Sequence, residues 1–159
     1  MKAMGPVPMG DVSENRRLSA NIMPPLMDVI SGEVYYNQYG RPLGAAHNSG
    51  RVSDFYLSVL ECGRDDDAPI NLSGELYING VTCLTTKPSI GGAASEAGSQ
   101  KTTRIAGDDD ITQAVIDGSA NDVTAGDVLS WDCIIDSQSS PDTKINGIVA
   151  VVVFEPESN

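Results

Sequence analysis

Residues 74–83 read GELYINGVTC, and this stretch decides the fold class. Asn79 and Gly80 both tolerate the positive φ values that a two-residue type I′ turn requires. A turn at that dipeptide pairs Ile78 with Val81 and places alternate apolar side chains on one face. Turn chemistry and hydrophobic alternation therefore agree, and the stretch predicts a β-hairpin.

Strand patterns continue on both sides of this hairpin. RVSDFYLSVLE (51–61) alternates apolar and polar residues, and so does AGDVLSWDCIID (125–136), in which Trp131 falls on the inward face. IVAVVVFE (148–155) is a nearly continuous apolar run, typical of a strand covered on both faces. Short strands between loops rich in Gly, Asp and Pro predict an all-β fold: a single jelly-roll-like β-sandwich over residues 51–159.

The first fifty residues show no such period. Pro24 and Pro25 interrupt their main apolar patch, because proline lacks an N–H and restricts the residue before it. We therefore expect residues 1–50 to form an extended, mostly irregular N-terminal arm and loop. Its apolar residues would pack on the body of the same chain or on a neighbouring chain.

Charge is distributed unevenly along the 159 residues. The chain has 10 basic and 22 acidic residues, a formal net charge of −12, and all of that excess lies after residue 50. Nucleic-acid binding needs clustered Lys and Arg, so nucleic acid is not an expected partner. An anionic membrane surface is excluded by the same argument, and no apolar run is long enough to span a bilayer.

The three cysteines predict neither a disulfide framework nor a metal knuckle. Cys62, Cys83 and Cys133 are odd in number and widely spaced, as expected for reduced thiols of a protein made in a cytoplasm. The N-terminus has no apolar segment of the kind that a secretory signal contains. No cofactor is expected.

Two acidic triplets are the weak candidates for a metal site. They comprise Asp65, Asp66, Asp67, Asp108, Asp109 and Asp110. A calcium loop needs ligands at alternate positions, a turn glycine and a distal Glu, and neither triplet has this pattern. We expect them to be solvated loop residues, and no metal.

Candidates for catalysis and for glycan binding are equally sparse. His47 lies in a loop without a neighbouring nucleophile motif, and Cys62 has no basic group nearby to lower its pKa. An enzyme is therefore not expected. Four aromatic residues are candidates for a sugar-stacking platform, although Trp131 fits the core better: Tyr35, Tyr36, Tyr39 and Trp131.

The body resembles a known family in texture and in the order of its segments. VSDFYLSVLECGRDDDAPINLSGELYINGVTCLTTKPSI (52–90), KTT (101–103), ITQAVID (111–117) and TAGDVLSWDCIID (124–136) look like the head decoration (cement) proteins of tailed bacteriophages. The resemblance covers roughly residues 50–155. It implies a jelly-roll viral structural protein that is made in the host cytoplasm and binds and stabilises the outer surface of the virion capsid.

The resemblance also implies partners. These are the major capsid protein and the protein itself, with a homotrimer favoured, and the arm would grip coat or neighbouring subunits. The residues expected to bind a partner are Met23, Pro24, Pro25, Leu26, Met27, Tyr35 and Tyr36. A carbohydrate-binding or receptor-binding sandwich of a virion is the alternative, and a small enzyme is a further one.

Overall fold

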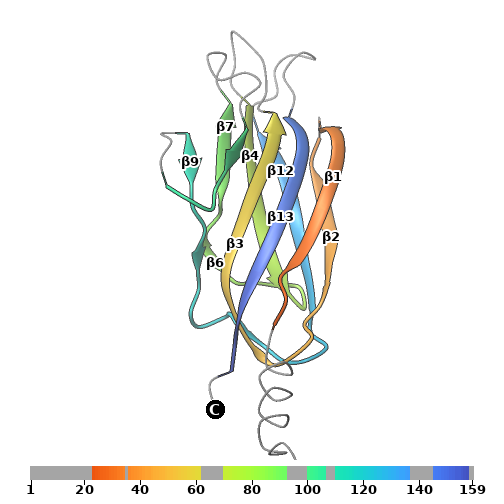
Figure 1. Ribbon diagram of the computed structural model, residues 1–159, viewed down its shortest axis with the longest axis vertical. Coiled ribbons are helices and arrows are strands. Elements are labelled where there is room, and N and C mark those ends of the chain that lie inside the picture. The colour runs from red at the N-terminus through yellow and green to blue at the C-terminus, as the bar shows by residue number, and fades with distance from the viewer. Residues whose placement is uncertain are drawn as a thin grey trace, which may run out of the picture.

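Two antiparallel sheets packed face to face form the body of the protein (Figure 1). The computed structural model describes residues 23–34, 36–61, 70–92, 100–106, 110–136 and 145–157. All regular elements within these ranges are strands, which confirms the predicted all-β sandwich.

The strands divide between two sheets and a small ribbon. Sheet A contains β1 (Leu26–Val34), β13 (Ile145–Pro156), β3 (Gly50–Glu61), β8 (Lys101–Thr102) and β11 (Asp122–Val123). Sheet B contains β2 (Gln38–Ala45), β12 (Val128–Asp136), β4 (Ile70–Ile78), β7 (Ser89–Gly92), β9 (Ile111–Thr112) and β5 (Val81–Thr82). The ribbon pairs β6 (Leu84–Thr86) with β10 (Val115–Ile116).

The order of pairing is that of a jelly roll. β1 pairs with the last strand, β13, and β2 pairs with the strand before it, β12. Further in, β3 pairs with β8 and β11, and β4 pairs with β7. Nested pairing of this kind folds one long antiparallel ribbon over itself, so that sequential strands alternate between the two sheets.

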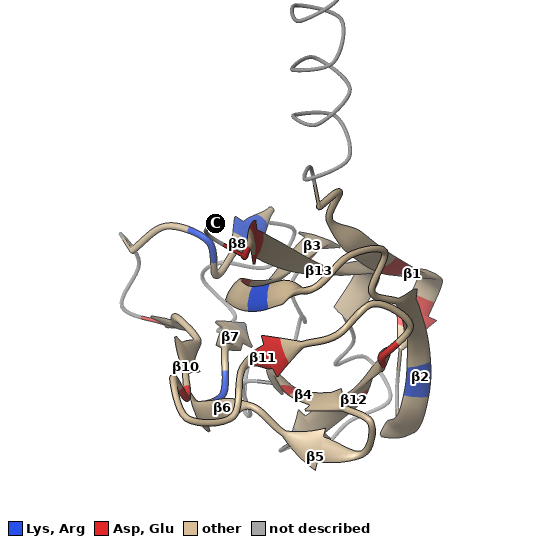
Figure 2. Cartoon of the chain, turned by 90° about the horizontal axis from the view of Figure 1, so that it is seen from below, with Lys and Arg blue, Asp and Glu red and all other residues tan. Residues whose placement is uncertain are grey.

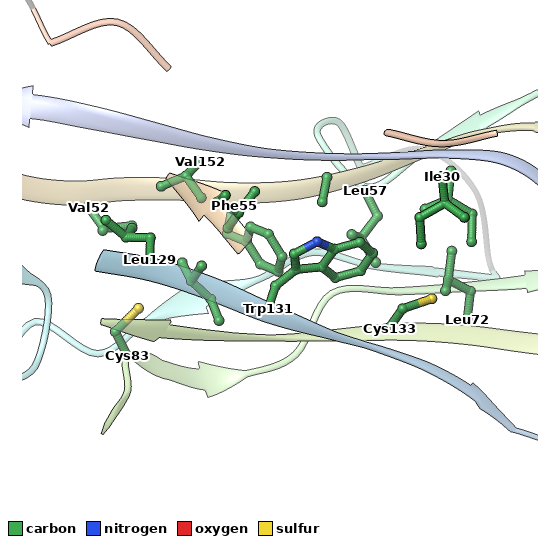
Figure 3. Packing of buried hydrophobic residues seen from close by; sticks show 14 of the residues in the cluster. Ile30, Val52, Phe55, Leu57, Leu72, Cys83, Leu129, Trp131, Cys133 and Val152 are labelled. Atoms are coloured by element: carbon green, nitrogen blue, oxygen red, sulfur yellow. The ribbon is translucent and has the colours of Figure 1, made fainter. Parts of the chain in front are cut away.

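The core lies between the sheets and is centred on Trp131. Its indole ring is fully buried and meets the ring of Phe55 edge to face, with the centroids 6.3 Å apart (Figure 3). Leu129, Cys133 and Ile135 share the inward face of β12 with Trp131, as the alternation predicts. An edge-to-face aromatic pair contributes about 0.5–1.5 kcal/mol beyond the apolar area it buries.

The predicted hairpin is confirmed at the junction of β4 and β5. Asn79 and Gly80 have φ values of 48° and 82°, and Ile78 pairs with Val81. Ile78 is buried, whereas Val81 is exposed because the hairpin tip extends past the end of the opposite sheet.

The predicted boundary at residue 50 is wrong. Residues 26–45 are not an irregular arm, because they form β1 and β2, the outermost strands of the two sheets on one side. Edge strands tolerate the irregularities that hide them in the sequence: β1 has a bulge between Ile30 and Glu33, and Pro42 lies in β2. Residues 1–22 lie outside the described part of the chain.

Met23 fixes the point at which the described chain begins. Its side chain is buried, and its Sδ lies only 2.5 Å from where a Cβ on Gly50 would stand. Glycine at position 50 is therefore what allows Met23 to enter the core at the start of β3. Pro24 and Pro25 follow on the exposed surface before β1 begins.

Asp28 closes the sandwich where β1 and β2 lie together at one edge (Figure 2). Its carboxylate accepts a hydrogen bond of 2.8 Å from Trp131 Nε1 and one of 2.6 Å from Arg41 Nε. The side chain of Asp28 is 15% exposed, and that of Arg41 is 27% exposed. One carboxylate from sheet A thus binds two strands of sheet B, and the hydrogen bond raises the pKa of Arg41.

We predict that Gly80→Ala lowers the free energy of unfolding by about 1–2 kcal/mol, because an L-residue is strained at a positive φ. Gly118→Ala is the matched control, since both glycines have open space around them and only Gly80 has a positive φ. The control should change stability by less than about 0.5 kcal/mol. Equal effects in urea denaturation would contradict the turn assignment.

We predict that Asp28→Ala costs about 2–3 kcal/mol, because it leaves the buried indole N–H of Trp131 without its acceptor. Asp132→Ala is the control, as it also removes a carboxylate that accepts two hydrogen bonds, but on the outer face of sheet B. Its cost should be about 1 kcal/mol. Thermal and denaturant unfolding measure both, and a smaller effect at Asp28 than at Asp132 would contradict the closure role.

Candidate binding surface

Neither described thiol is suited to chemistry. Cys83 and Cys133 are fully buried and free, and burial raises the pKa of each to about 12. At neutral pH both are protonated, whereas a nucleophilic cysteine needs its thiolate. Cys62, the thiol singled out in the sequence, lies outside the described residues.

Of the other polar candidates, two fall within the described residues. His47 is exposed in a loop between β2 and β3. Asp110 forms an ion pair of 3.7 Å with the buried Lys101, whose Nζ also donates to the backbone oxygen of Gly91. This acid therefore has a structural contact between the two sheets, and the remaining five aspartates of the triplets lie outside the described residues.

Groups of three or more His, Cys, Asp or Glu side chains that might hold a metal are absent from the described ranges. An open cleft of about 310 Å³ near the start of β3 is lined by Arg51, Asp122 and Glu157 among others. Neither His47 nor a described thiol lines it. The structure thus gathers none of the described catalytic candidates into a common pocket.

The aromatic candidates do not come together as a platform. Trp131 is fully buried, so it belongs to the core as the alternation predicts. Tyr36 and Tyr39 are each 68% exposed at the junction of β1 and β2, and Asn37 donates a hydrogen bond to the Tyr39 hydroxyl. Tyr35 lies outside the described residues.

The predicted partner-binding residues of the arm separate into two groups. Met23 is buried and Leu26 packs partly against the core, so neither is available to a partner in this structure. Met27 and Tyr36 are exposed, at 57% and 68%. Pro24 and Pro25 are exposed as well.

The outer face of sheet B is polar and internally bonded. Glu75 is 8% exposed even though it points away from the core; it accepts a hydrogen bond from Thr82 and lies 3.3 Å from Lys87 Nζ. Beside it, the Tyr77 hydroxyl donates a hydrogen bond of 2.8 Å to Asp132. Burial, followed by that hydrogen bond, raises the pKa of Tyr77 to about 12. This face satisfies its own polar groups.

The outer face of sheet A is apolar instead. We call it face A, and its members come from three adjacent strands: Met27, Val29, Tyr56, Leu60, Val149, Val151 and Val153. They alternate with core residues along β1, β3 and β13, so they point outward. Sequence reasoning had recognised only the apolar run of β13, because the outward residues of β1 were assigned to the arm.

The strand register brings the members of face A side by side. Val151 lies between Met27 on β1 and Tyr56 on β3, and is left 5% exposed. In contrast, Met27, Val29 and Leu60 are 57%, 52% and 62% exposed. Single exposed apolar residues are normal in proteins, but a contiguous group on three strands marks an interaction surface.

Acidic residues lie at both ends of face A. At one end, Glu33 and Glu61 are paired with the same residue of β13, Asn146, from its two sides. At the other end, Asp54 lies opposite Val153, and Glu155 follows on β13. Four acids thus stand at the ends of an apolar centre.

Two basic residues accompany these acids. Arg51 lies 4.0 Å from Glu155, with both side chains more than half exposed, so their attraction is weak. Arg104 stacks over the ring of Tyr56, with its Cζ 5.2 Å from the ring centroid. The ends of face A therefore keep an acidic excess.

No protein-family model matches the chain, and no curated protein is similar to it at a significant level. The described residues include no helix with the length and hydropathy needed to cross a membrane.

We predict that Cys83 and Cys133 resist iodoacetamide in the native protein at about pH 8, because their burial keeps them protonated. Unfolding in guanidinium chloride should expose both to rapid alkylation, and peptide mass spectrometry distinguishes the two states. Alkylation of either residue in the native protein at the rate of a free thiol would contradict the buried arrangement.

The same pKa shifts predict a loss of stability at alkaline pH. The unfolded thiols ionise near pH 8.5, whereas the folded ones ionise near 12, so the folded state holds more protons between these values. The free energy of unfolding is therefore expected to fall as the pH rises from about 9 to 12. Cys83→Ala should reduce the slope of that fall.

Proposed function

We propose that this protein is a non-enzymatic decoration protein, which binds the outer surface of a tailed-bacteriophage capsid and stabilises it. The jelly-roll fold is consistent with the family that the sequence resembles, although many unrelated functions use the same fold. The proposal therefore rests on features of this chain, and on the resemblance, rather than on the fold alone.

The observation that carries the proposal is the way in which the chain divides at Met23. Residues 1–22 contain three basic and two acidic residues, whereas the chain from Met23 onward contains seven basic and twenty acidic residues. Burial of Met23 attaches the N-terminal segment firmly to one end of a rigid sandwich. A basic segment tethered to an acidic body suits a protein that grips a partner with its arm and faces the solvent with its body.

The proposed arm is thus shorter than the sequence alone predicts. It consists of residues 1–22, since residues 26–45 are needed for both sheets. The proposed partner is the major capsid protein, and the proposed location is the outer surface of the virion. Stabilisation follows from mass action, because a ligand that binds only the assembled shell raises the free energy needed to disrupt it.

Co-sedimentation with purified capsids of the source phage tests this proposal. We expect the full chain to sediment with the capsids, and a variant that begins at Met23 to bind at least about tenfold more weakly. The truncated variant should keep the melting temperature of the full chain, because every described strand is retained. That comparison separates loss of grip from loss of fold.

Two outcomes would contradict the proposal. If the full chain does not sediment with the capsids, a decoration function is excluded. If the truncated variant binds as well as the full chain, residues 1–22 are not the gripping element.

A further inference from the structure

We infer that face A is a second contact with the capsid, and that the coat-protein surface seated on it has an apolar centre with Lys or Arg at both ends. This inference rests on the proposed function and adds the surface and the chemistry of its partner. It is distinct from the arm, because all of its residues lie in the strands of sheet A.

The size of face A indicates what kind of surface it accepts. Three exposed and three half-buried apolar side chains present on the order of 400 Å², which is within the range of functional patches on monomers. A standard stable interface buries about 800 Å² on each partner, so face A alone suits one strand or helix of a partner. A contact of this size contributes usefully when an arm already holds the two proteins together.

The charges around face A decide between a second copy and a different partner. In a two-fold pairing of two copies, the same surface meets itself, so each end of one face A meets an end of the other. Both ends are acidic, through Glu33 and Glu61 at one end and Asp54 and Glu155 at the other. Every such pairing therefore sets acids against acids, in a chain whose net charge is −12.

A partner with basic ends has the opposite effect. Its Lys or Arg residues would meet the acidic ends of face A, while its apolar centre covers Met27, Val29 and Leu60. Rim charges of this kind act mainly on the rate of association and on its salt dependence, whereas the apolar centre contributes most of the affinity. Orientation on the shell is then set by the direction of the strands of sheet A.

Val29→Glu tests this inference, with Val128→Glu as the matched control. The two valines are 52% and 53% exposed and lie on the outer faces of sheets A and B respectively. In capsid co-sedimentation with the full chain, we expect Val29→Glu to weaken binding at least tenfold and Val128→Glu to change it less than twofold. Both variants should melt within a few degrees of the wild type, because both side chains face the solvent.

Salt dependence tests the charge of the partner. Binding of the wild type should weaken as the salt concentration rises from roughly 50 to 500 mM, because screening removes the attraction at the ends of face A. The variant Glu33→Gln/Glu61→Gln should bind more weakly at low salt and show a smaller salt dependence. Binding that strengthens with salt, or a double variant with unchanged salt dependence, would overturn the basic-ended partner.

The remaining outcomes separate this inference from the proposed function. Equal binding by the wild type, Val29→Glu and Val128→Glu overturns the role of face A and leaves the decoration function standing. A wild-type dimer that Val29→Glu alone converts to a monomer in sedimentation equilibrium would assign face A to a second copy and overturn the inference. Absence of wild-type binding overturns the proposed function and the inference together.

Discussion

The buried carboxylate of Asp28 is the interaction on which the arrangement of the two sheets depends. It comes from an edge strand of sheet A and accepts hydrogen bonds from Trp131 and Arg41, which belong to sheet B. A buried carboxylate is costly unless its oxygens are bonded, so its two partners must stay in place once the sandwich has closed. Trp131 in turn is the centre of the core, and its contact with Phe55 fixes the opposite sheet.

This closure also determines which residues of β1 face the solvent. With Asp28 inward, Leu26 and Ile30 must point inward too, and Met27 and Val29 must point outward. A slip of one residue would bury Met27 and Val29 but would expel Asp28 from its partners, at a cost that two half-exposed side chains do not offset. The apolar character of face A is therefore linked to the polar contact inside the sandwich.

The same acid explains what the sequence could and could not predict. The hairpin at Asn79 and Gly80 and the inward face of β12 follow from turn chemistry and alternation, because those strands lie inside the sheets. In β1 the inward position 28 is an acid, so the hydrophobic period is broken at the point where the strand needs it. An acid on the face of Leu26 and Ile30 is itself a signal for a buried partner, but its partners lie 13 and 103 residues away.

Stability of the sandwich does not require face A to be apolar. Threonine and other polar β-formers would suit the outward positions of β1 and β13, just as polar residues serve on the outer face of sheet B. A contiguous apolar face lowers the solubility of the free protein, and the net charge of −12 counteracts this by keeping copies apart. Strong like charge combined with one neutral apolar centre is an arrangement that opposes self-association while preserving a surface for a basic-ended partner. The composition of the whole chain and the local placement of its apolar side chains thus favour the same kind of contact, one made with a different protein.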